Sequence, residues 1–381
     1  MDSTPGPTAD SPCADSRTTA SKFSRSRILT VSGPSARRVT KPSRNSSTDE
    51  ARLVPESSLG PLTFAPLLKR ARWGGTRLAS LLGKPDHASA DCSESWEVAD
   101  HADDQSVVSN GPWQGWTLQR LTREHGDELL GRHAPRDRFP LLVKFLDATD
   151  RLSLQVHPDD TTARRIAPHL RGKTEAWTVL AAEPESRFWA GLVPGTSPET
   201  LAAALDNDDI DSCIPSFAAE TGQCVLVPAG TVHAIGEGIV LAEIQQTSDL
   251  TFRLHDWGRF DHDGQPRPLQ RSEGLAAIDF SCGAVRPTVV TTQHPRDGHR
   301  IESLVDRDEF VIVRHRVSSD TVLDNDNRFR ILTVIDGRGT LEVDGTQLPL
   351  DTGKTVLLPA SIHQATVAGD PDVTLLDSHL P

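Results

Sequence analysis

The sequence predicts a mainly β protein that contains two copies of one β-barrel module and a small helical insertion. First, residues 285–381 consist almost entirely of short apolar segments separated by turn signals, a spacing typical of sandwiches and barrels. Second, residues 222–233 align with residues 353–363 and share Gly, Val-Leu, Pro-Ala and His. Such an internal repeat indicates two related modules. We therefore expect one domain over residues 58–284 and a second over residues 285–381.

Local patterns define the individual elements. A short helix is expected over residues 78–82. Residues 197–217 form the helical insertion, because a serine and a proline give a helix start and aliphatic residues then recur at helical spacing. The dipeptides Asp336-Gly and Asp344-Gly are expected to be turns between strands. Strands are expected over residues 95–98, 105–108, 139–146, 154–157, 176–181, 223–227, 232–235, 239–245, 310–313, 329–334, 339–343 and 355–358.

The N-terminal segment differs from the rest of the chain. Residues 1–57 are rich in Ser, Thr, Pro and Arg and show no sustained hydrophobic period. Such a segment cannot bury enough apolar surface to offset the entropy of ordering it, so we expect it to be disordered. Its three early aspartates, Asp2, Asp10 and Asp15, argue against a transit peptide, and no secretory hydrophobic region is present.

Bulk composition restricts the possible partners and the compartment. The 381 residues carry a net charge of −13, which argues against general nucleic-acid binding because that needs a basic surface. No apolar run is long enough to span a membrane, so no membrane association is expected. The five cysteines are scattered and form no CxxC pair, which favours a reducing cytoplasm over a disulfide framework. The composition leaves the oligomeric state open.

Four polar residues form a candidate metal site. Gln155 and His157 are two positions apart in an alternating run, so both side chains would project from one face of a strand. Glu175 begins the next strand-like run, and His233 follows a Pro-Ala-Gly turn. One amide oxygen, two imidazoles and one carboxylate are a plausible ligand set for a divalent cation.

These residues lie in motifs that closely resemble the short bacterial form of the type I mannose-6-phosphate isomerase family. The resemblance covers the chain from about residue 60 to the C terminus. It rests on the motifs Trp73-Gly-Gly75, Ser95-Trp-Glu97, Gln155-x-His157, Gly172-Lys-Thr-Glu175, Val227-Pro-Ala-Gly-Thr-Val-His233 and residues 243–257, which begin Glu-Ile-Gln-Gln-Thr-Ser-Asp.

The resemblance implies a double cupin fold with one zinc ion per chain. By resemblance, the zinc ligands are Gln155, His157, Glu175 and His233, and the polar active-site residues are Lys173, Glu243 and Arg253. The implied substrate is a small sugar phosphate. The second barrel has no counterparts to the ligands, so His363, which aligns with His233, is expected to be structural.

The implied reaction interconverts mannose 6-phosphate and fructose 6-phosphate through an enediol intermediate. Zinc would stabilise the developing negative charge, and a carboxylate such as Glu243 would shuttle the proton. Arg253 would stabilise an oxyanion or bind phosphate. The chain departs from the family at Phe252, where a tyrosine is common, at His255, where an aromatic hydroxyl is usual, and before Glu94, where a glycine is often found.

The residues are also compatible with two other functions. The set of His157, His233 and Glu175 also suits a non-haem Fe(II) cupin oxygenase, although Gln155 would then occupy a fourth position. The other alternative is a non-catalytic cupin that binds sugar phosphates. For Lys173, Glu243 and Arg253 the ordinary structural roles are a solvated strand end, a structural carboxylate and an ion pair with Asp249 or Asp256.

Overall fold

The computed structural model describes residues 55, 57–85, 90–260 and 264–381. These residues belong to one compact unit that extends to Pro381. The disorder predicted for residues 1–57 concerns a segment that lies almost entirely outside the described residues. Within the described part, no helix has the length and apolar character needed to cross a membrane.

The first half of the chain forms two antiparallel sheets. The first sheet has the order β1-β2-β5-β12-β7-β10. Its strands are β1 (Leu67–Gly75), β2 (Cys92–Val98), β5 (Leu141–Ala148), β12 (Ile239–Gln246), β7 (Glu175–Ala182) and β10 (Cys224–Val227). The second sheet has the order β13-β6-β11-β8-β9. Its strands are β13 (Phe252–His255), β6 (Leu154–Val156), β11 (His233–Ile235), β8 (Arg187–Ala190) and β9 (Ser216–Ala218). A small separate hairpin joins β3 (Asp100–His101) to β4 (Asp104–Gln105).

An apolar core holds these two sheets together. Trp177 and Leu241 of the first sheet pack in one buried cluster with Phe188 and Ile235 of the second. Trp177 and Phe188 stack with ring centroids 5.1 Å apart. Alternating strand residues face this core, while the long central strands β5 and β12 are buried along almost their whole length because both of their faces are covered.

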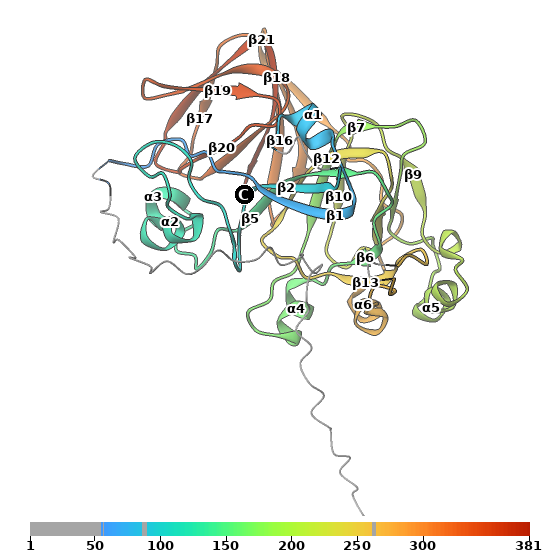
Figure 1. The fold of residues 1–381 in the computed structure, drawn as a ribbon. Helices are drawn as coiled ribbons and strands as arrows, with labels where there is room; N and C mark the ends of the chain where they lie inside the picture. The colour runs from blue at the N-terminus through green and yellow to red at the C-terminus, as the bar shows by residue number, and fades with distance from the viewer. Residues whose placement is uncertain (1–54, 56, 86–89, 261–263) are drawn as a thin grey trace, which may run out of the picture. The chain divides into compact units, whose positions relative to one another are not determined.

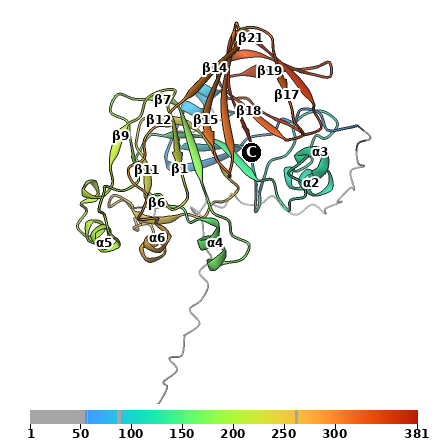
Figure 2. The ribbon, with the colours of Figure 1, turned by 180° about the vertical axis from the view of Figure 1, so that it is seen from behind.

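The third sheet belongs entirely to the C-terminal part of the chain. Its main path is β14-β15-β16-β21-β18-β19, with β17 paired to β21 and β20 paired to β18. Figure 2 shows these strands from behind as one orange and red body. The strands are β14 (Thr291–Arg296), β15 (His299–Asp306), β16 (Val311–Val317), β17 (Thr321–Asp324), β18 (Arg330–Val343), β19 (Thr346–Asp351), β20 (Thr355–Leu358) and β21 (Gln364–His379).

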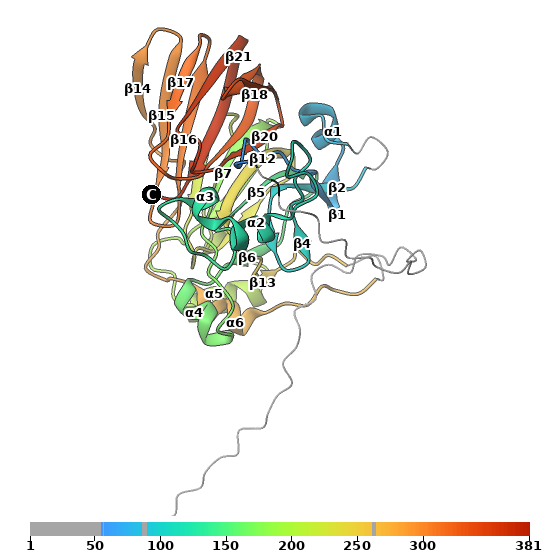
Figure 3. The ribbon, with the colours of Figure 1, turned by 90° about the vertical axis from the view of Figure 1, so that its left-hand side faces the viewer.

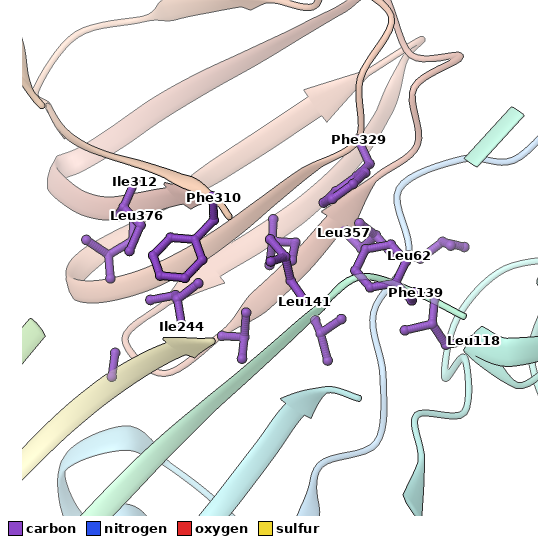
Figure 4. Close-up of a cluster of buried hydrophobic side chains, with 14 of the residues drawn as sticks. Leu62, Leu118, Phe139, Leu141, Ile244, Phe310, Ile312, Phe329, Leu357 and Leu376 are labelled. Carbon is purple, nitrogen blue, oxygen red and sulfur yellow. The ribbon is translucent and has the colours of Figure 1, made fainter. Parts of the chain in front are cut away.

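One continuous core joins the C-terminal sheet to the first sheet. Phe310 and Phe329 of the C-terminal part point toward Ile244, Leu141 and Phe139 of the first half (Figure 4). The rings of Phe139 and Phe329 have centroids 4.7 Å apart. The two halves therefore share buried apolar surface.

The helices lie at the margins of the sheets. They are α1 (Arg77–Leu82), α2 (Leu118–Glu124), α3 (Gly126–Leu130), α4 (Asp160–Ile166), α5 (Pro198–Asp206), the 3-10 turn η1 (Ile210–Ser212) and α6 (Arg271–Ala277). Helices α4, α5 and α6 gather at the end of the first-half sheets that is remote from β18 and β21 (Figures 1 and 3).

The predicted mainly β fold class is confirmed, and so are the helices at residues 78–82 and within 197–217, which correspond to α1 and α5. Four short helices, α2, α3, α4 and α6, were not predicted. The prediction of a turn at Asp336-Gly is wrong, because both residues lie inside the long strand β18. Register shifts interrupt the pairing of β18 with β21 on both sides of the dipeptide, and a Cβ at Gly337 would meet a backbone oxygen of Asp372 at 2.2 Å. The dipeptide therefore marks a bulge.

The second turn prediction and one strand prediction also have clear outcomes. Asp344 and Gly345 have φ values of 48° and 77° and connect β18 to β19, as a tight hairpin turn requires. The strand predicted over residues 105–108 is mostly wrong. Only Gln105 belongs to a strand, β4, while Val107 and Val108 form isolated bridges.

Candidate metal centre and active site

Three of the four predicted metal ligands converge in the interior of the first half. Nε2 of His157 lies 3.3 Å from Oε2 of Glu175, and Nε2 of His233 lies 3.3 Å from Oε1 of the same carboxylate. One ligand atom from each residue fits within a group whose members are all within 4.8 Å of one another. All three side chains are buried, with 2% exposure or less.

Strand pairing and turn hydrogen bonds place these side chains. His233 of β11 pairs directly with Gln155 of β6, so their side chains project from the same face. His157 follows β6 and is tied back by its carbonyl, which accepts the Gly230 N–H at 2.7 Å. Lys173, just before β7, donates its own backbone N–H to the carbonyl of Pro158 at 3.1 Å. The loops carrying His157, Glu175 and His233 are thereby fixed to one another.

Hydrogen bonds behind the triad orient its members. Nδ1 of His157 lies 3.1 Å from the carbonyl oxygen of Leu250, and Nδ1 of His233 lies 2.9 Å from that of Thr231. Because a carbonyl only accepts, each Nδ1 carries the proton and each Nε2 presents a lone pair to the triad. Trp177 donates its indole N–H to Oε1 of Glu175 at 3.1 Å. Such contacts orient ligands at metal sites.

Gln155 completes the set. Its amide nitrogen lies 3.3 Å from Nε2 of His233. Rotation of the amide group by half a turn would present the oxygen to the same place, and a side-chain amide is free to make this exchange. All four predicted ligands therefore adjoin one point of the interior.

Lys173 is a cation inside this cluster. Its Nζ lies 2.7 Å from Oε2 of Glu175 and 3.2 Å from Nε2 of His157. Burial alone would raise the pKa of Glu175, but the charge of Lys173 reverses this and holds the pKa well below its ordinary value. Burial and then the Lys173 charge lower the pKa of His157 to about 3. Burial also lowers the pKa of His233, so both imidazoles are neutral near pH 7.

Glu243 on β12 is the second carboxylate of the interior. Its Oε1 lies 3.5 Å from Nζ of Lys173 and 3.3 Å from Nζ of Lys144. Burial, followed by the nearby charge of Glu175, raises the pKa of Glu243 to about 7. Glu243 is therefore poised to take up or release a proton near neutral pH.

Lys144 and Glu94, to which no role was predicted, extend the chain of charged contacts beyond Glu243. Lys144 on β5 lies 3.1 Å from Oε2 of Glu94 on β2. The available signal was a lysine within the apolar segment 139–146, which was expected to be a buried strand. A buried lysine is uncommon unless it is paired.

Arg253, the last of the predicted polar residues, lies on β13 directly across from Gln155. Its guanidinium donates to the carbonyl of Pro268 at 3.0 Å. Its Nε is buried and has no hydrogen-bond partner among the described residues. The alternative of an Asp256 ion pair is not what the structure contains, since Asp256 is taken by Arg259 and Arg267.

The donor set fits a divalent cation. Two neutral imidazoles, a carboxylate held in its charged form and an amide are donors that such ions accept. Oε2 of Glu175 is buried without a hydrogen-bond partner among the described residues, although it lies beside Lys173. By contrast, His363 is exposed and lies before β21 of the other sheet, away from the described triad.

Comparisons with known proteins place this arrangement in context. Residues 62–188 match the family description "Phosphomannose isomerase type I, catalytic domain". Residues 300–380 match "Mannose-6-phosphate isomerase, cupin domain". The first match includes the strands that carry Glu94, Lys144 and Glu175, and the second includes most of the C-terminal sheet.

Individual relatives match over most of their length. The chain is 34% identical to the mannose-6-phosphate isomerase ManA of Bacillus subtilis over 310 residues, which are 81% of this chain and 96% of that protein. It is 32% identical to the mannose-6-phosphate isomerase of Streptococcus mutans over 314 residues, 82% of this chain and 96% of that protein. A crystal structure of the Bacillus subtilis mannose 6-phosphate isomerase matches with 31% identity and a TM-score of 0.78, over 84% of this chain and 100% of that chain.

Proposed function

Because this chain belongs to the type I phosphomannose isomerase family, we propose that it is a zinc-dependent isomerase that interconverts mannose 6-phosphate and fructose 6-phosphate. The observation that carries the proposal is the buried triad of His157, Glu175 and His233 beside a second carboxylate whose pKa is near neutrality. A metal site alone would suit many reactions. The adjoining Glu243 supplies the proton carrier that an aldose–ketose exchange requires.

The proposed ligands of the single metal ion are Gln155, His157, Glu175 and His233. A bound divalent cation would stabilise negative charge on the sugar oxygens during proton transfer. The protein's part is to keep both imidazoles neutral through burial and Lys173. It also keeps Glu175 charged through Lys173 and Trp177.

Glu243 is the proposed proton carrier. The reaction removes a proton from C2 of the aldose, passes through an enediol and returns a proton to C1. Since burial raises the pKa of Glu243 to about 7, its carboxylate can accept the first proton and its acid form can return it without a large energetic penalty. Lys173, which lies between Glu175 and Glu243, stabilises the negative charge of either group.

Arg253 is proposed to bind the anionic part of the substrate. It stands across the sheet from Gln155, and its buried Nε has no protein acceptor among the described residues. A guanidinium in this situation suits a phosphate or an oxyanion, both of which accept a planar pair of N–H groups. We also propose the cytoplasm as the compartment, because no disulfide joins the four described cysteines.

The test is to assay the purified protein with mannose 6-phosphate, before and after complete chelation and after re-addition of zinc. We expect turnover to fructose 6-phosphate, loss of turnover on chelation and recovery with zinc. The assay is run anaerobically and without iron as well, because an oxygenase would be silent there. Full activity after verified metal removal, or no isomerisation with metal bound, would contradict the proposal.

A further inference from the structure

A row of three charged side chains, Glu94, Lys144 and Glu243, crosses the first sheet on strands β2, β5 and β12. Lys144 stands at its centre and pairs directly with Glu243 in the strand register. Its Nζ lies 3.1 Å from Oε2 of Glu94 and 3.3 Å from Oε1 of Glu243. Lys144 is 6% exposed, so the two carboxylates are what allows the ammonium to remain charged in this position.

Glu94 is itself fixed in place. The oxygen that contacts Lys144 also accepts the indole N–H of Trp96 at 2.7 Å. Burial alone would raise the pKa of Glu94, but the charge of Lys144 reverses this and holds the pKa below its ordinary value. Trp96 stands opposite Lys144 on the neighbouring strand. The lysine is therefore held on one side by a carboxylate that has little freedom to move, and it presents its charge to Glu243 on the other.

Two lysines, Lys144 of the row and Lys173 before β7, approach the same oxygen of Glu243. Lys144 and Lys173 lie 3.3 and 3.5 Å from Oε1, distances typical of ion pairs without a directed hydrogen bond. Lys173 has a shorter contact with Glu175, at 2.7 Å, so it is shared with the predicted metal site. Lys144 contacts none of the four predicted ligands in the described structure. Its two carboxylate partners there are Glu94 and Glu243.

We propose that Lys144, anchored by Glu94, is a positioning residue that holds Glu243 by Oε1 and leaves Oε2 to exchange the proton with the sugar. This inference rests on the proposed function. Lys144 is not a catalytic residue in this scheme, because it acts through the carboxylate. Without Lys144, Oε1 of Glu243 would keep only the longer contact with the shared Lys173, and the proton acceptor would lose its alignment with C1 and C2.

The decisive variant is Lys144→Met, which keeps an apolar stem of similar length and removes the charge. We expect wild-type metal content, a KM within about threefold of wild type and a kcat lower by about 10²-fold, the scale of a misplaced general base. Exchange of solvent deuterium into the sugar should fall by the same factor as kcat. Lys69→Met is the matched control, because Lys69 lies over the same Trp96 ring at 4.7 Å but pairs with Asp104.

A double variant shows whether the lysine acts through the carboxylate. If it does, Lys144→Met combined with Glu243→Gln should be no slower than Glu243→Gln alone, because residues that act as a unit lose their effects together. Should Lys144→Met fail to fold, Glu94→Gln provides the same test with the lysine retained. It should lower kcat by about tenfold without changing metal content, since a neutral amide holds the ammonium less firmly.

Several results would overturn the inference. The first is a wild-type kcat and exchange rate in Lys144→Met, or in Glu94→Gln if only that variant folds. The second is a loss of metal that accompanies the loss of activity. The third is a double variant whose loss of kcat equals the product of the two single losses. Failure of the proposed function has a different signature, because the wild-type protein would then lack isomerase turnover and exchange altogether.

Discussion

Glu175 is the only anionic residue among the four predicted metal ligands, and its two oxygens serve different partners. Oε1 accepts the Trp177 indole N–H and faces His233, whereas Oε2 faces His157 and Lys173. The carboxylate therefore bridges both imidazoles. Its negative charge is also the only ligand charge that offsets the repulsion between Lys173 and an incoming cation.

Replacing Glu175 with glutamine should abolish metal binding. The change removes the ligand charge and leaves the Lys173 ammonium beside the site without its closest partner. We expect less than a tenth of the wild-type metal content by elemental analysis. The control variant is His363→Ala, because His363 is exposed and lies near the C-terminal sheet. This variant should retain one equivalent of metal. Two equivalents in the wild-type protein, or one in Glu175→Gln, would refute this assignment.

Replacing Lys173 with methionine should have the opposite effect on the metal. The ammonium contacts the same Glu175 and His157 atoms that a cation would use, so its removal ends a repulsion between like charges. We expect zinc affinity to rise by about tenfold, with turnover reduced, in a competition titration against a chelator. Weaker zinc binding would mean that Lys173 instead preorganises the ligands.

At the scale of elements, the segment just before β7 connects the site to the rest of the fold. The Thr174 hydroxyl accepts the N–H of Ala229 at 3.2 Å and lies 3.3 Å from Oε1 of Glu309. Ala229 belongs to the turn that precedes His233, and Glu309 belongs to the loop between β15 and β16. One hydroxyl thus links the Glu175 strand, the His233 turn and the C-terminal part.

Thr174→Val removes this link and keeps the side-chain shape. The Ala229 N–H loses its partner, so the turn should loosen and zinc affinity should fall by about 10- to 100-fold, as for other residues that orient metal ligands. Thr333→Val is the matched control, because the Thr333 hydroxyl is buried without a hydrogen-bond partner in the described structure. Equal zinc affinities in the two variants, measured by competition titration, would rule out this role of Thr174.

The elements also show which features the sequence could predict. Strand β12 was predictable because it is a long apolar run bounded by turn residues. Helix α4 was not, because its seven residues bury only Ala163 and so leave no apolar period. Helix α6 buries only Gly274 and Ala277, and packing against neighbouring strands replaces the missing local signal.

The same limit applies to the site. Gln155, His157, Glu175 and His233 lie in motifs whose residue types already suggest metal chemistry. Lys144 and Glu94 do not lie in a motif whose residue types suggest metal chemistry. Their importance comes from strand pairing, which sets Lys144 opposite Glu243, and that register depends on long-range contacts that one sequence does not reveal.

At the scale of the whole molecule, the acid stability of the C-terminal sheet depends on a buried carboxylate. Asp377 on β21 is fully buried, forms an ion pair with Arg330 and lies 3.5 Å from Nε2 of His315. Burial would raise its pKa, but the charge of Arg330 and the hydrogen bond to His315 reverse this and hold the pKa below its ordinary value. The folded state therefore gains stability when Asp377 is ionised.

Asp377→Asn should destabilise the protein in a pH-dependent way. The pair is intact above the unfolded-state pKa of about 3.9, so we expect a loss of about 3 kcal/mol at pH 7 because Arg330 remains buried without its charge partner. The difference from wild type should shrink as the pH falls below about 4. Urea unfolding at several pH values measures this, with the exposed Asp351→Asn as control. A difference that stays constant down to pH 3 would contradict the assignment.

The shared core predicts that the two halves of the described unit unfold together. Phe329 of the C-terminal part is fully buried and packs on Phe139 of the first half, within one continuous apolar cluster. All seven tryptophans lie at or before Trp257, so tryptophan fluorescence reports only on the first half, whereas circular dichroism reports on both.

Phe329→Ala should therefore lower the stability of the first half, although Phe329 belongs to the C-terminal part. Removing the ring leaves a cavity in the common core, for which we expect a loss of about 3–5 kcal/mol. Urea unfolding of metal-free protein should show the fluorescence and circular dichroism midpoints falling by the same amount, because a single cooperative transition moves every probe together. Val322→Ala, at a partly exposed position of β17 in the same C-terminal sheet, should leave both midpoints nearly unchanged. If Phe329→Ala lowers only the circular dichroism midpoint, the C-terminal sheet unfolds on its own and the shared core does not couple the halves.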